Sequence, residues 1–326
     1  MRHVTMTIVL GLISLLCAAC QGSAGGERTT ADTDTAAVTI VVPTFDADSA
    51  LLLVQAQCDM GPRVPGTPAH RRCAAWLSQR LRAVTDTVIE QRGEVVTFDG
   101  KHLTAVNIIG SINPGAAQRV LLLAHWDCRP WADNDPDEAR RREPVMGAND
   151  AASGVAVLLE MARAMAKTPP AVGVDILLVD VEDWGTDGDE DSWALGTQYW
   201  VQHPHVPGYQ PVCGILLDMV GAKGAQFAQE YYSLHYASGI VDLVWQEAAK
   251  AGFATRFVGA SGHAITDDHV VVNRAGIPCI DIIDTRTHSK TGFFDAWHTT
   301  HDTMEHIDLA TLRAVGQTLL NVLYSF

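Results

Sequence analysis

The most constraining feature of the sequence is the stretch over residues 174–185, an apolar run that ends in acidic residues. Residues 174–181 are rich in Val, Ile and Leu over the length of one strand, which is typical of a strand buried on both faces of a sheet. Asp180, Glu182 and Asp183 stand at its carboxyl end, where the chemistry of open α/β sheets collects. The same pattern also fits a strand that ends in solvated acids.

Glu182 and Asp183 are adjacent, and their side chains point in different directions if the backbone there is still extended. We therefore expect the two side chains to have different functions. A metal ligand beside a proton carrier is the natural division of such a pair, with Asp180 left as a supporting residue.

The composition describes a compact globular protein. The chain has 326 residues, of which 47% are hydrophobic and 19% are charged, so it can bury a sizeable core. Its formal net charge is −15, and no basic stretch is clustered enough to offset phosphate repulsion. The charge therefore argues against a nucleic-acid partner.

The N-terminus reads as an export signal. Arg2 and His3 precede an apolar run over residues 6–19, which is too short for a resident membrane helix and is typical of a secretory signal peptide. The run ends Leu16-Cys-Ala-Ala-Cys20, which resembles a bacterial lipobox with the Leu one place further from Cys20 than usual. We expect cleavage of residues 1–19 and lipidation of Cys20, which predicts an exported, periplasmic protein anchored to a membrane. Ordinary signal-peptide cleavage nearby is the alternative.

The mature chain is predicted to be a tether followed by one domain. Residues 20–44 are assigned to a flexible tether because their first part is rich in Gly, Ser, Thr, Ala and Asp, with no apolar period. Residues 45–326 are assigned to the folded domain. Its five cysteines leave at least one thiol free, and Cys58 and Cys73 are the nearest pair in sequence for a disulfide. The sequence leaves that pairing open.

Strands alternate with helices from residue 119 onward, which predicts an α/β fold. We expect a single-domain, three-layer sandwich in which helices cover both faces of a mixed, mostly parallel central sheet. Strands are expected over residues 87–98, 105–112, 119–125, 174–181, 212–219 and 279–283. Helices are expected around residues 51–55 and over 69–83, 155–165, 193–202, 236–251 and 308–324.

Residues of the types that bind metals recur at the ends of these strands or in the loops that follow them. Imidazole and carboxylate ligands suit zinc, and a catalytic zinc keeps one position open for substrate. Any one such residue fits a loop cap or a turn, but a set of them at strand ends indicates a site. His125 and Asp127 are either part of a second metal site or a pair in which Asp127 orients the imidazole. The set is His125, Asp150, Asp183, Asp218 and His298.

A series of motifs, taken in order, resembles the M28-type zinc aminopeptidase superfamily. The motifs are His125-Trp-Asp127, Gly147-Ala-Asn-Asp150-Ala-Ala-Ser-Gly154, Asp180-Val-Glu-Asp183, Leu217-Asp-Met-Val-Gly-Ala222 and Trp297-His298-Thr-Thr-His-Asp302. Within it, the chain is most similar to the single-zinc glutaminyl cyclases, in the bacterial branch that resembles the animal enzymes. Features of that branch are Gly61-Pro-Arg-Val-Pro-Gly66, Trp193, Asp267-Asp268-His269 and Trp297 directly before His298. The resemblance extends from about residue 51 to the C-terminus.

This resemblance implies a zinc-dependent acyltransferase that converts the N-terminal glutamine of peptides or proteins to pyroglutamate and releases ammonia. It implies one zinc, with Glu182 as the general acid/base. Asp218 and Asp267 would form a hydrogen-bonded acidic pair beside the reacting centre. The implied zinc ligands are Asp150, Asp183 and His298, and the implied walls of the glutaminyl pocket are Trp193, Trp297 and Ile265.

The sequence departs from the family pattern at two positions. Asp183 stands where animal cyclases and aminopeptidases have Glu, so its backbone must lie closer to the metal. His125, which binds the second metal of two-zinc aminopeptidases, is retained. An aminopeptidase that uses two zincs and water is therefore the alternative function. A non-catalytic peptide-binding lipoprotein on the same scaffold is a second alternative.

Overall fold

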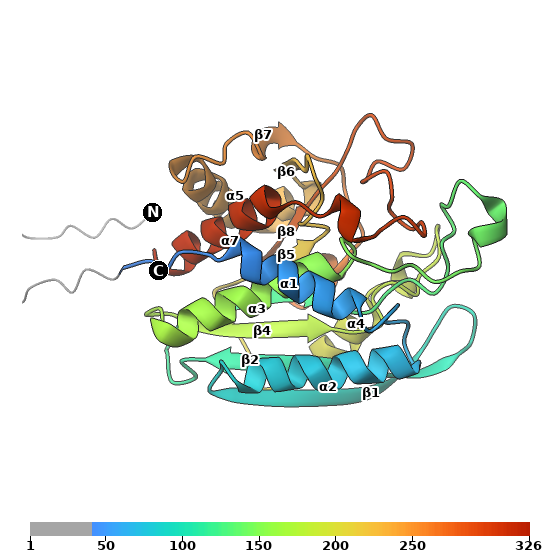
Figure 1. Ribbon diagram of the computed structural model, residues 1–326. Helices are drawn as coiled ribbons and strands as arrows, with labels where there is room; N and C mark the ends of the chain where they lie inside the picture. Colours follow the sequence, from blue (N-terminus) through green and yellow to red (C-terminus); the bar gives the residue numbers. More distant parts are fainter. Residues whose placement is uncertain (1–40) are drawn as a thin grey trace, which may run out of the picture. The chain divides into compact units, whose positions relative to one another are not determined.

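The computed structural model describes residues 41–326, which belong to one compact unit with a six-stranded central sheet. The strands of this sheet are β1 (Thr87–Val96), β2 (His102–Ile112), β3 (Arg119–His125), β4 (Gly173–Val179), β5 (Cys213–Asp218) and β8 (Cys279–Ile283). Their order is β1-β2-β4-β3-β5-β8 (Figure 1). β2 is antiparallel to both of its neighbours, whereas β4, β3, β5 and β8 are parallel to one another.

Helices cover this sheet, and a small parallel pair of strands stands apart from it. The helices are α1 (Ala47–Cys58), α2 (Pro68–Arg82), α3 (Ala152–Lys167), α4 (Leu195–Gln202), α5 (Tyr231–Lys250), α6 (Asp268–Arg274) and α7 (Leu309–Leu323). Short 3₁₀ turns occur at Glu138–Arg140, Glu190–Ser192 and Met304–His306, and the strand pair is β6 (Phe227–Gln229) with β7 (Phe257–Ser261). None of the helices in residues 41–326 has the length and apolar character that crossing a bilayer requires.

The central strands are buried on both faces, as their apolar sequences predict. Along β3, Leu122 and Ala124 pack into a large core with α1, α2, α3, α5 and α7, while Leu121 and Leu123 pack into a smaller core with α4 and α6. Successive side chains of β4 alternate between the same two cores. Because each buried aliphatic side chain stabilises the fold by about 1.5–3 kcal/mol, both faces must be covered. The predicted three-layer architecture is confirmed.

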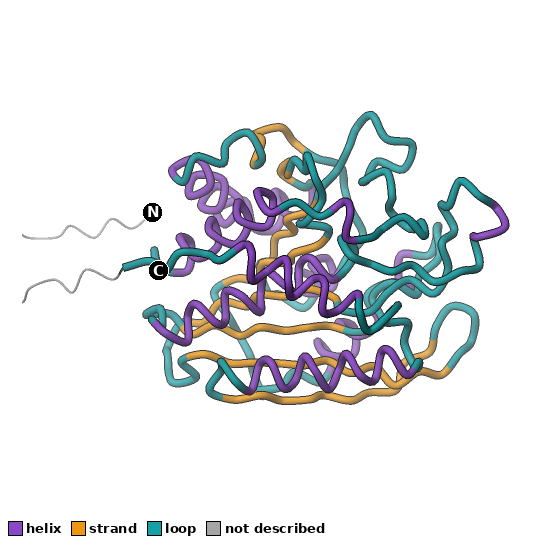
Figure 2. The backbone as a smooth tube through the Cα atoms, viewed as in Figure 1, coloured by secondary structure: helices purple, strands orange, loops and turns teal. Residues whose placement is uncertain are grey.

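The functional end of the sheet is set by where β4 stops. The strand was expected over residues 174–181 but ends at Val179, because Val181 has a positive φ of 54° and turns the chain. Asp180 fixes this turn: its carboxylate accepts the N–H groups of Val106 (2.7 Å) and Val181 (2.9 Å) and contacts Nε2 of His70 at 2.9 Å. The loops that follow the parallel strands gather at this end of the sheet (Figure 2).

Other element bounds differ from the expectations in instructive ways. The strands over residues 119–125 and 279–283 have the expected bounds, but β6, β7 and α6 were missed because they are short and carry no clear apolar period. The helix expected from residue 193 begins at Leu195, after the turn Glu190–Ser192. The predicted signal peptide, most of the tether and Cys20 lie outside the described residues.

The cysteines of the described chain are all buried and unpaired. Cys58 and Cys73 therefore form no disulfide in this structure. Burial raises the pKa of the Cys58 thiol to about 11 and that of Cys73 to about 12, so both are neutral at ordinary pH. Both thiols act as small apolar groups in the core between α1, α2 and α3.

We predict that Asp175→Asn destabilises the fold without affecting the site. Asp175 in β4 binds Arg119 through both oxygens at 2.6 Å and accepts hydrogen bonds from Ser111 and Tyr209. Burial raises the pKa of Asp175, but these donors lower it more, so the net shift is downward. The ionised Asp175 therefore stabilises the fold fully at neutral pH, and this stabilisation is lost as the pH falls through its lowered pKa. Breaking such a buried pair costs about 3–5 kcal/mol, which urea unfolding would measure. Ser111→Ala, which removes one donor, should cost only about 1 kcal/mol. An unchanged free energy of unfolding for Asp175→Asn would contradict the assignment.

Candidate metal centre and active site

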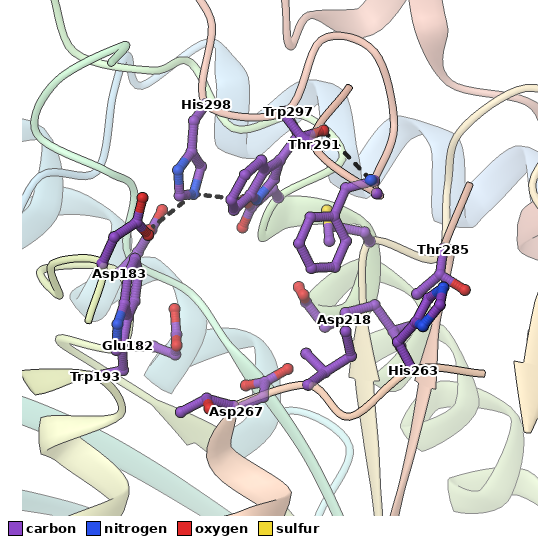
Figure 3. Close-up of a pocket in the computed structure, with 18 of the residues that line it drawn as sticks. Glu182, Asp183, Trp193, Asp218, His263, Asp267, Thr285, Thr291, Trp297 and His298 are labelled. Atoms are coloured by element: carbon purple, nitrogen blue, oxygen red, sulfur yellow. Dashed lines mark hydrogen bonds and ion pairs between the residues drawn. The ribbon is translucent and has the colours of Figure 1, made fainter. Parts of the chain in front are cut away.

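A cavity of about 570 Å³ opens at the carboxyl ends of β4, β5 and β8. Carboxylates, aromatic side chains and the loop over residues 263–267 line it (Figure 3). Chemistry is expected at this end of a parallel sheet. The residues singled out from the sequence that line it are Asp150, Glu182, Asp183, Trp193, Asp218, Ile265, Asp267, Trp297 and His298.

Asp150, Asp183 and His298 come together at one wall of the cavity. Each offers a ligand atom, and these atoms lie within 4.8 Å of one another. Nε2 of His298 is 3.1 Å from Asp183 Oδ1 and 3.6 Å from Asp150 Oδ2. Oδ2 of Asp183 is buried and has no hydrogen-bond partner among the described residues. Converging buried carboxylates with an orphaned oxygen fit a divalent cation, and this donor set suits zinc.

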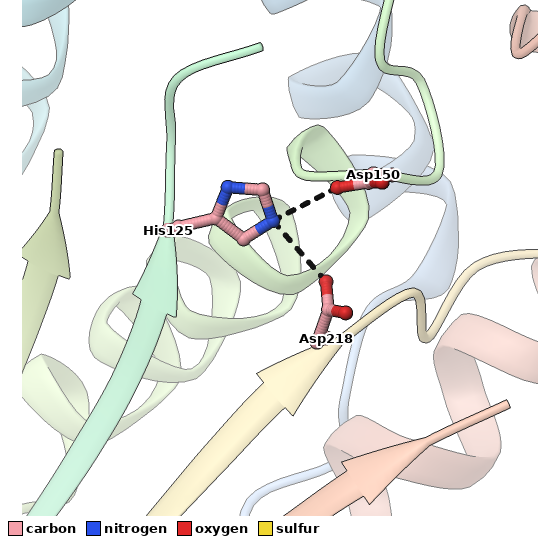
Figure 4. A group of neighbouring side chains, drawn as sticks. All are labelled: His125, Asp150 and Asp218. Atoms are coloured by element: carbon pink, nitrogen blue, oxygen red, sulfur yellow. Dashed lines mark hydrogen bonds and ion pairs between the residues drawn. The ribbon is translucent and has the colours of Figure 1, made fainter. Parts of the chain in front are cut away.

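A second group of donors shares Asp150 with the first. Nε2 of His125 lies 2.9 Å from Asp150 Oδ1 and 3.2 Å from Asp218 Oδ1 (Figure 4). Burial alone would lower the pKa of His125, but its contacts with Asp127, Asp150 and Asp218 raise it well above the usual value. The same three side chains could hold a metal ion, so either a proton on the imidazole or a second cation can offset the charge of the two carboxylates.

Asp127 holds the turn that presents Glu182 and Asp183. Its two oxygens accept the backbone N–H groups of Glu182 (3.1 Å) and Asp183 (3.3 Å). Its distance of 3.5 Å to Nδ1 of His125 is long for a hydrogen bond, so the turn is its main partner. The backbone is not extended here, and both acidic side chains line the same cavity. The expectation of opposed side chains applied to an extended backbone, and the chain has already left the strand at these two residues.

Three further acids of the cavity, Glu182, Asp218 and Asp267, have raised pKa values. Burial raises the pKa of Glu182 well above its usual value; His125 opposes this shift, while Asp267 and Asp183 add to it. Burial also raises the pKa of Asp218 and, further, that of Asp267, on which the charge of Asp218 acts in the same direction. Asp267 is held at the N-cap of α6, where it accepts the N–H of Asp268 at 2.5 Å. Carboxyl groups that resist ionisation together can share and pass protons.

Two tryptophans wall the cavity. Trp297 stacks on the ring of His298 with centroids 3.8 Å apart, and Trp193 lies parallel to the same ring at 6.3 Å. Ile265 belongs to the facing loop, and its N–H donates to Oε1 of Glu230 at 3.0 Å. These side chains give the otherwise acidic cavity an aromatic and apolar wall.

Several further residues support the site without lining the cavity. Asp302 accepts the N–H groups of Asn149 (2.9 Å) and Asp150 (3.0 Å), so it fixes the turn that carries Asp150. Burial raises the pKa of Asp302 to about 7. Glu230 pairs with the buried His269 at 3.1 Å. Arg129 and Asp133 pack behind Asp183 and His298. Asp302 ends the Trp297–Asp302 motif, whereas Arg129, Asp133 and Glu230 were not singled out from the sequence.

A mostly parallel sheet with carboxylate and imidazole donors at its strand ends defines a metal-dependent enzyme of the zinc exopeptidase class. Residues 107–323 match the model of peptidase family M28, and the chain belongs to this family. It is 48% identical to the glutaminyl cyclase of Bacteroides thetaiotaomicron, solved with bound N-acetylhistamine; the similarity covers 88% of this chain and 100% of that one, with a TM-score of 0.86.

Two further solved structures show the range of the relatives. The glutaminyl cyclase of Porphyromonas gingivalis is 49% identical over 87% of this chain and 99% of its own, with a TM-score of 0.85. A Zn-dependent exopeptidase from Parabacteroides distasonis is 48% identical over 88% of this chain and 100% of its own, with a TM-score of 0.86. The predicted resemblance to M28-type proteins and to bacterial glutaminyl cyclases is confirmed, and the family supports zinc as the metal.

Proposed function

We propose that the protein cyclises N-terminal glutamine of peptides or proteins to pyroglutamate and releases ammonia. The observation that carries this proposal is the position of Glu182, a buried carboxyl group in a tryptophan-walled cavity beside the metal-type donors. A group of raised pKa in this position can take up and return a proton. Similarity to two solved glutaminyl cyclases supports the proposal.

One zinc is proposed, held by Asp150, Asp183 and His298. The shorter side chain of Asp183 is compatible with this role, because its Oδ1 already lies 3.1 Å from the ligand atom of His298. Zinc bound there would polarise the γ-carbonyl of the substrate glutamine as a Lewis acid. His125 is proposed to remain a charged partner of Asp150 and Asp218.

The reaction needs no activated water, because the α-amine of the substrate is itself the nucleophile. It attacks the γ-carbonyl carbon, so a carbon–nitrogen bond forms and the bond to the side-chain nitrogen breaks. Glu182 accepts a proton from the attacking amine and returns it to the departing nitrogen, which leaves as ammonia. Such proton transfer contributes about 10²–10⁴-fold in rate. Asp218 and Asp267 are proposed to share a proton beside this centre and so limit the negative charge around Glu182.

The walls of the cavity supply orientation. Trp193, Trp297 and Ile265 are proposed to hold the glutamine side chain so that the amine and the carbonyl lie at attack distance. Favourable intramolecular orientation contributes about 7–11 kcal/mol to lowering a barrier. The open side of the cavity leaves room for the rest of the peptide.

We predict that Glu182→Gln abolishes ammonia release from peptides that begin with glutamine while zinc stays bound. The amide keeps the shape of the side chain but cannot accept the proton. In the unmodified protein, ammonia release should increase with pH as Glu182 ionises through its raised pKa. A chelator that removes zinc should abolish ammonia release. The matched control is Glu247→Gln on α5, which lies outside the cavity. Full activity of Glu182→Gln, with ammonia measured by a coupled assay, would refute the assigned role.

An aminopeptidase is the second candidate, and the His125–Asp150–Asp218 group favours it. The two functions differ in metal content. For a cyclase we predict one zinc per chain, retained in His125→Ala and lost in Asp183→Ala, as measured by elemental analysis. Two zincs per chain, together with cleavage of amino-acid anilides and no ammonia from glutamine-initiated peptides, would establish the aminopeptidase instead.

We also propose that the protein is exported and held at a membrane by a lipid on Cys20. The apolar run before Cys20 and the polar tether after it support this proposal. Full-length protein expressed in a bacterium should fractionate with membranes, and Cys20→Ser should release it to the soluble fraction. Membrane association that survives this substitution would exclude the lipid anchor.

A further inference from the structure

Arg129 is a buried cation directly behind the wall of the cavity that carries Asp183 and Trp193. It follows β3 in the chain, is 3% exposed and does not itself line the cavity. The side chains that do line it include no lysine or arginine among residues 41–326. The mechanism above leaves Arg129 without a function.

The guanidinium of Arg129 binds the segment that carries Asp183. Its Nη1 donates to the backbone carbonyls of Asp183 (3.2 Å) and Gly185 (3.3 Å). The same nitrogen lies 3.4 Å from Oδ1 of Asp183, the atom that contacts His298. One side chain therefore fixes both the backbone and the carboxylate of a proposed zinc ligand.

The other edge of the guanidinium reaches the second ligand through Asp133. Nε and Nη2 of Arg129 donate to the two oxygens of Asp133 at 2.9 and 2.5 Å. Oδ1 of Asp133 lies 3.6 Å from Nδ1 of His298, the nitrogen that faces away from the metal position. Asp133 also balances the charge of Arg129, so the pair adds little net charge beside a bound dication.

The flat face of the guanidinium supports the aromatic wall. Its Cζ lies 5.0 Å from the ring centre of Trp193 and 5.1 Å from that of Trp131. Trp193 is in turn stacked parallel to His298. Figure 3 shows Asp183, Trp193 and His298 on the same side of the cavity.

We propose that Arg129 is a positioning residue that couples metal binding to the Trp193 wall of the substrate pocket. This inference rests on the proposed function for the role of Trp193 and on the proposed zinc ligands Asp183 and His298. Arginine suits this position because its planar guanidinium donates hydrogen bonds from two edges while its face stacks on an aromatic ring. Lysine keeps the charge but has no such plane. Because one side chain contacts both, the proposed zinc ligands and the Trp193 wall of the pocket become ordered together.

The test compares Arg129→Lys with Arg119→Lys. Arg119 also binds an aspartate through two nitrogens, but it lies at the opposite end of β3. In Arg129→Lys we expect zinc affinity, measured by competition with a chelating dye, to fall about 10–100-fold, the range seen when supporting partners of metal ligands are removed. With zinc saturating, we expect KM for glutamine-initiated peptides to rise roughly threefold or more and kcat to change less, since the planar group that stacks on Trp193 is lost. Arg119→Lys should lower the melting temperature and leave both quantities unchanged.

A second variant keeps the test decisive if Arg129→Lys does not fold. Asp133→Asn removes a half-exposed partner, and we expect it to weaken zinc binding about tenfold through His298. Wild-type zinc affinity in both folded variants would overturn the proposal, as would weaker zinc binding with an unchanged KM. If the unmodified protein released no ammonia from glutamine peptides, the proposed function would fail, while the effect on zinc affinity would still be measured.

Discussion

The structure depends on how buried carboxylates are kept from repelling one another. Asp150, Asp183 and Asp218 meet at the ends of three chain segments, where burial weakens their solvation and proximity adds like-charge repulsion. The imidazoles of His125 and His298 and the guanidinium of Arg129 are packed among them. An arrangement of this kind is stable only with bound protons or a bound cation, and this requirement links the fold of the region to its chemistry.

A second set of buried acids fixes the backbone of turns and loops. Asp127, Asp180 and Asp302 each accept two backbone N–H groups and so fix the turns beside the site. Glu230 does the same at the start of α5 and also holds the loop of Ile265. A carboxylate is the strongest acceptor available for this purpose, and it shapes loops that carry few apolar contacts of their own. The acidity of the chain therefore reflects loop architecture as well as catalysis.

Much of this could be predicted from the sequence, and the reasons for the rest are physical. The long apolar strands and the residues at their ends are local signals, so β3, β8 and the residues lining the cavity could be placed from sequence patterns and family motifs. The turn at Val181 could not, because a positive φ at a β-branched residue is imposed by its surroundings rather than by its own preference. Arg129 and Asp133 were missed because their partners, Asp183 and His298, are distant in the chain. Short elements such as α6 have too few residues to show a period.

The early end of β4 has a consequence for how such a site can vary during evolution. Glu182 and Asp183 are separated by a single peptide bond, and both N–H groups are bound to one carboxylate on a neighbouring strand's loop. An insertion or deletion between Val179 and Asp183 would change the spacing of these two bonds and shift one of the two side chains relative to the cavity. The loop that follows, around Asp187 and Gly188, is exposed and makes few such bonds. A change of length in this loop would alter the cavity, which Asp187 and Gly188 line, and would leave the two bonds of Asp127 unchanged.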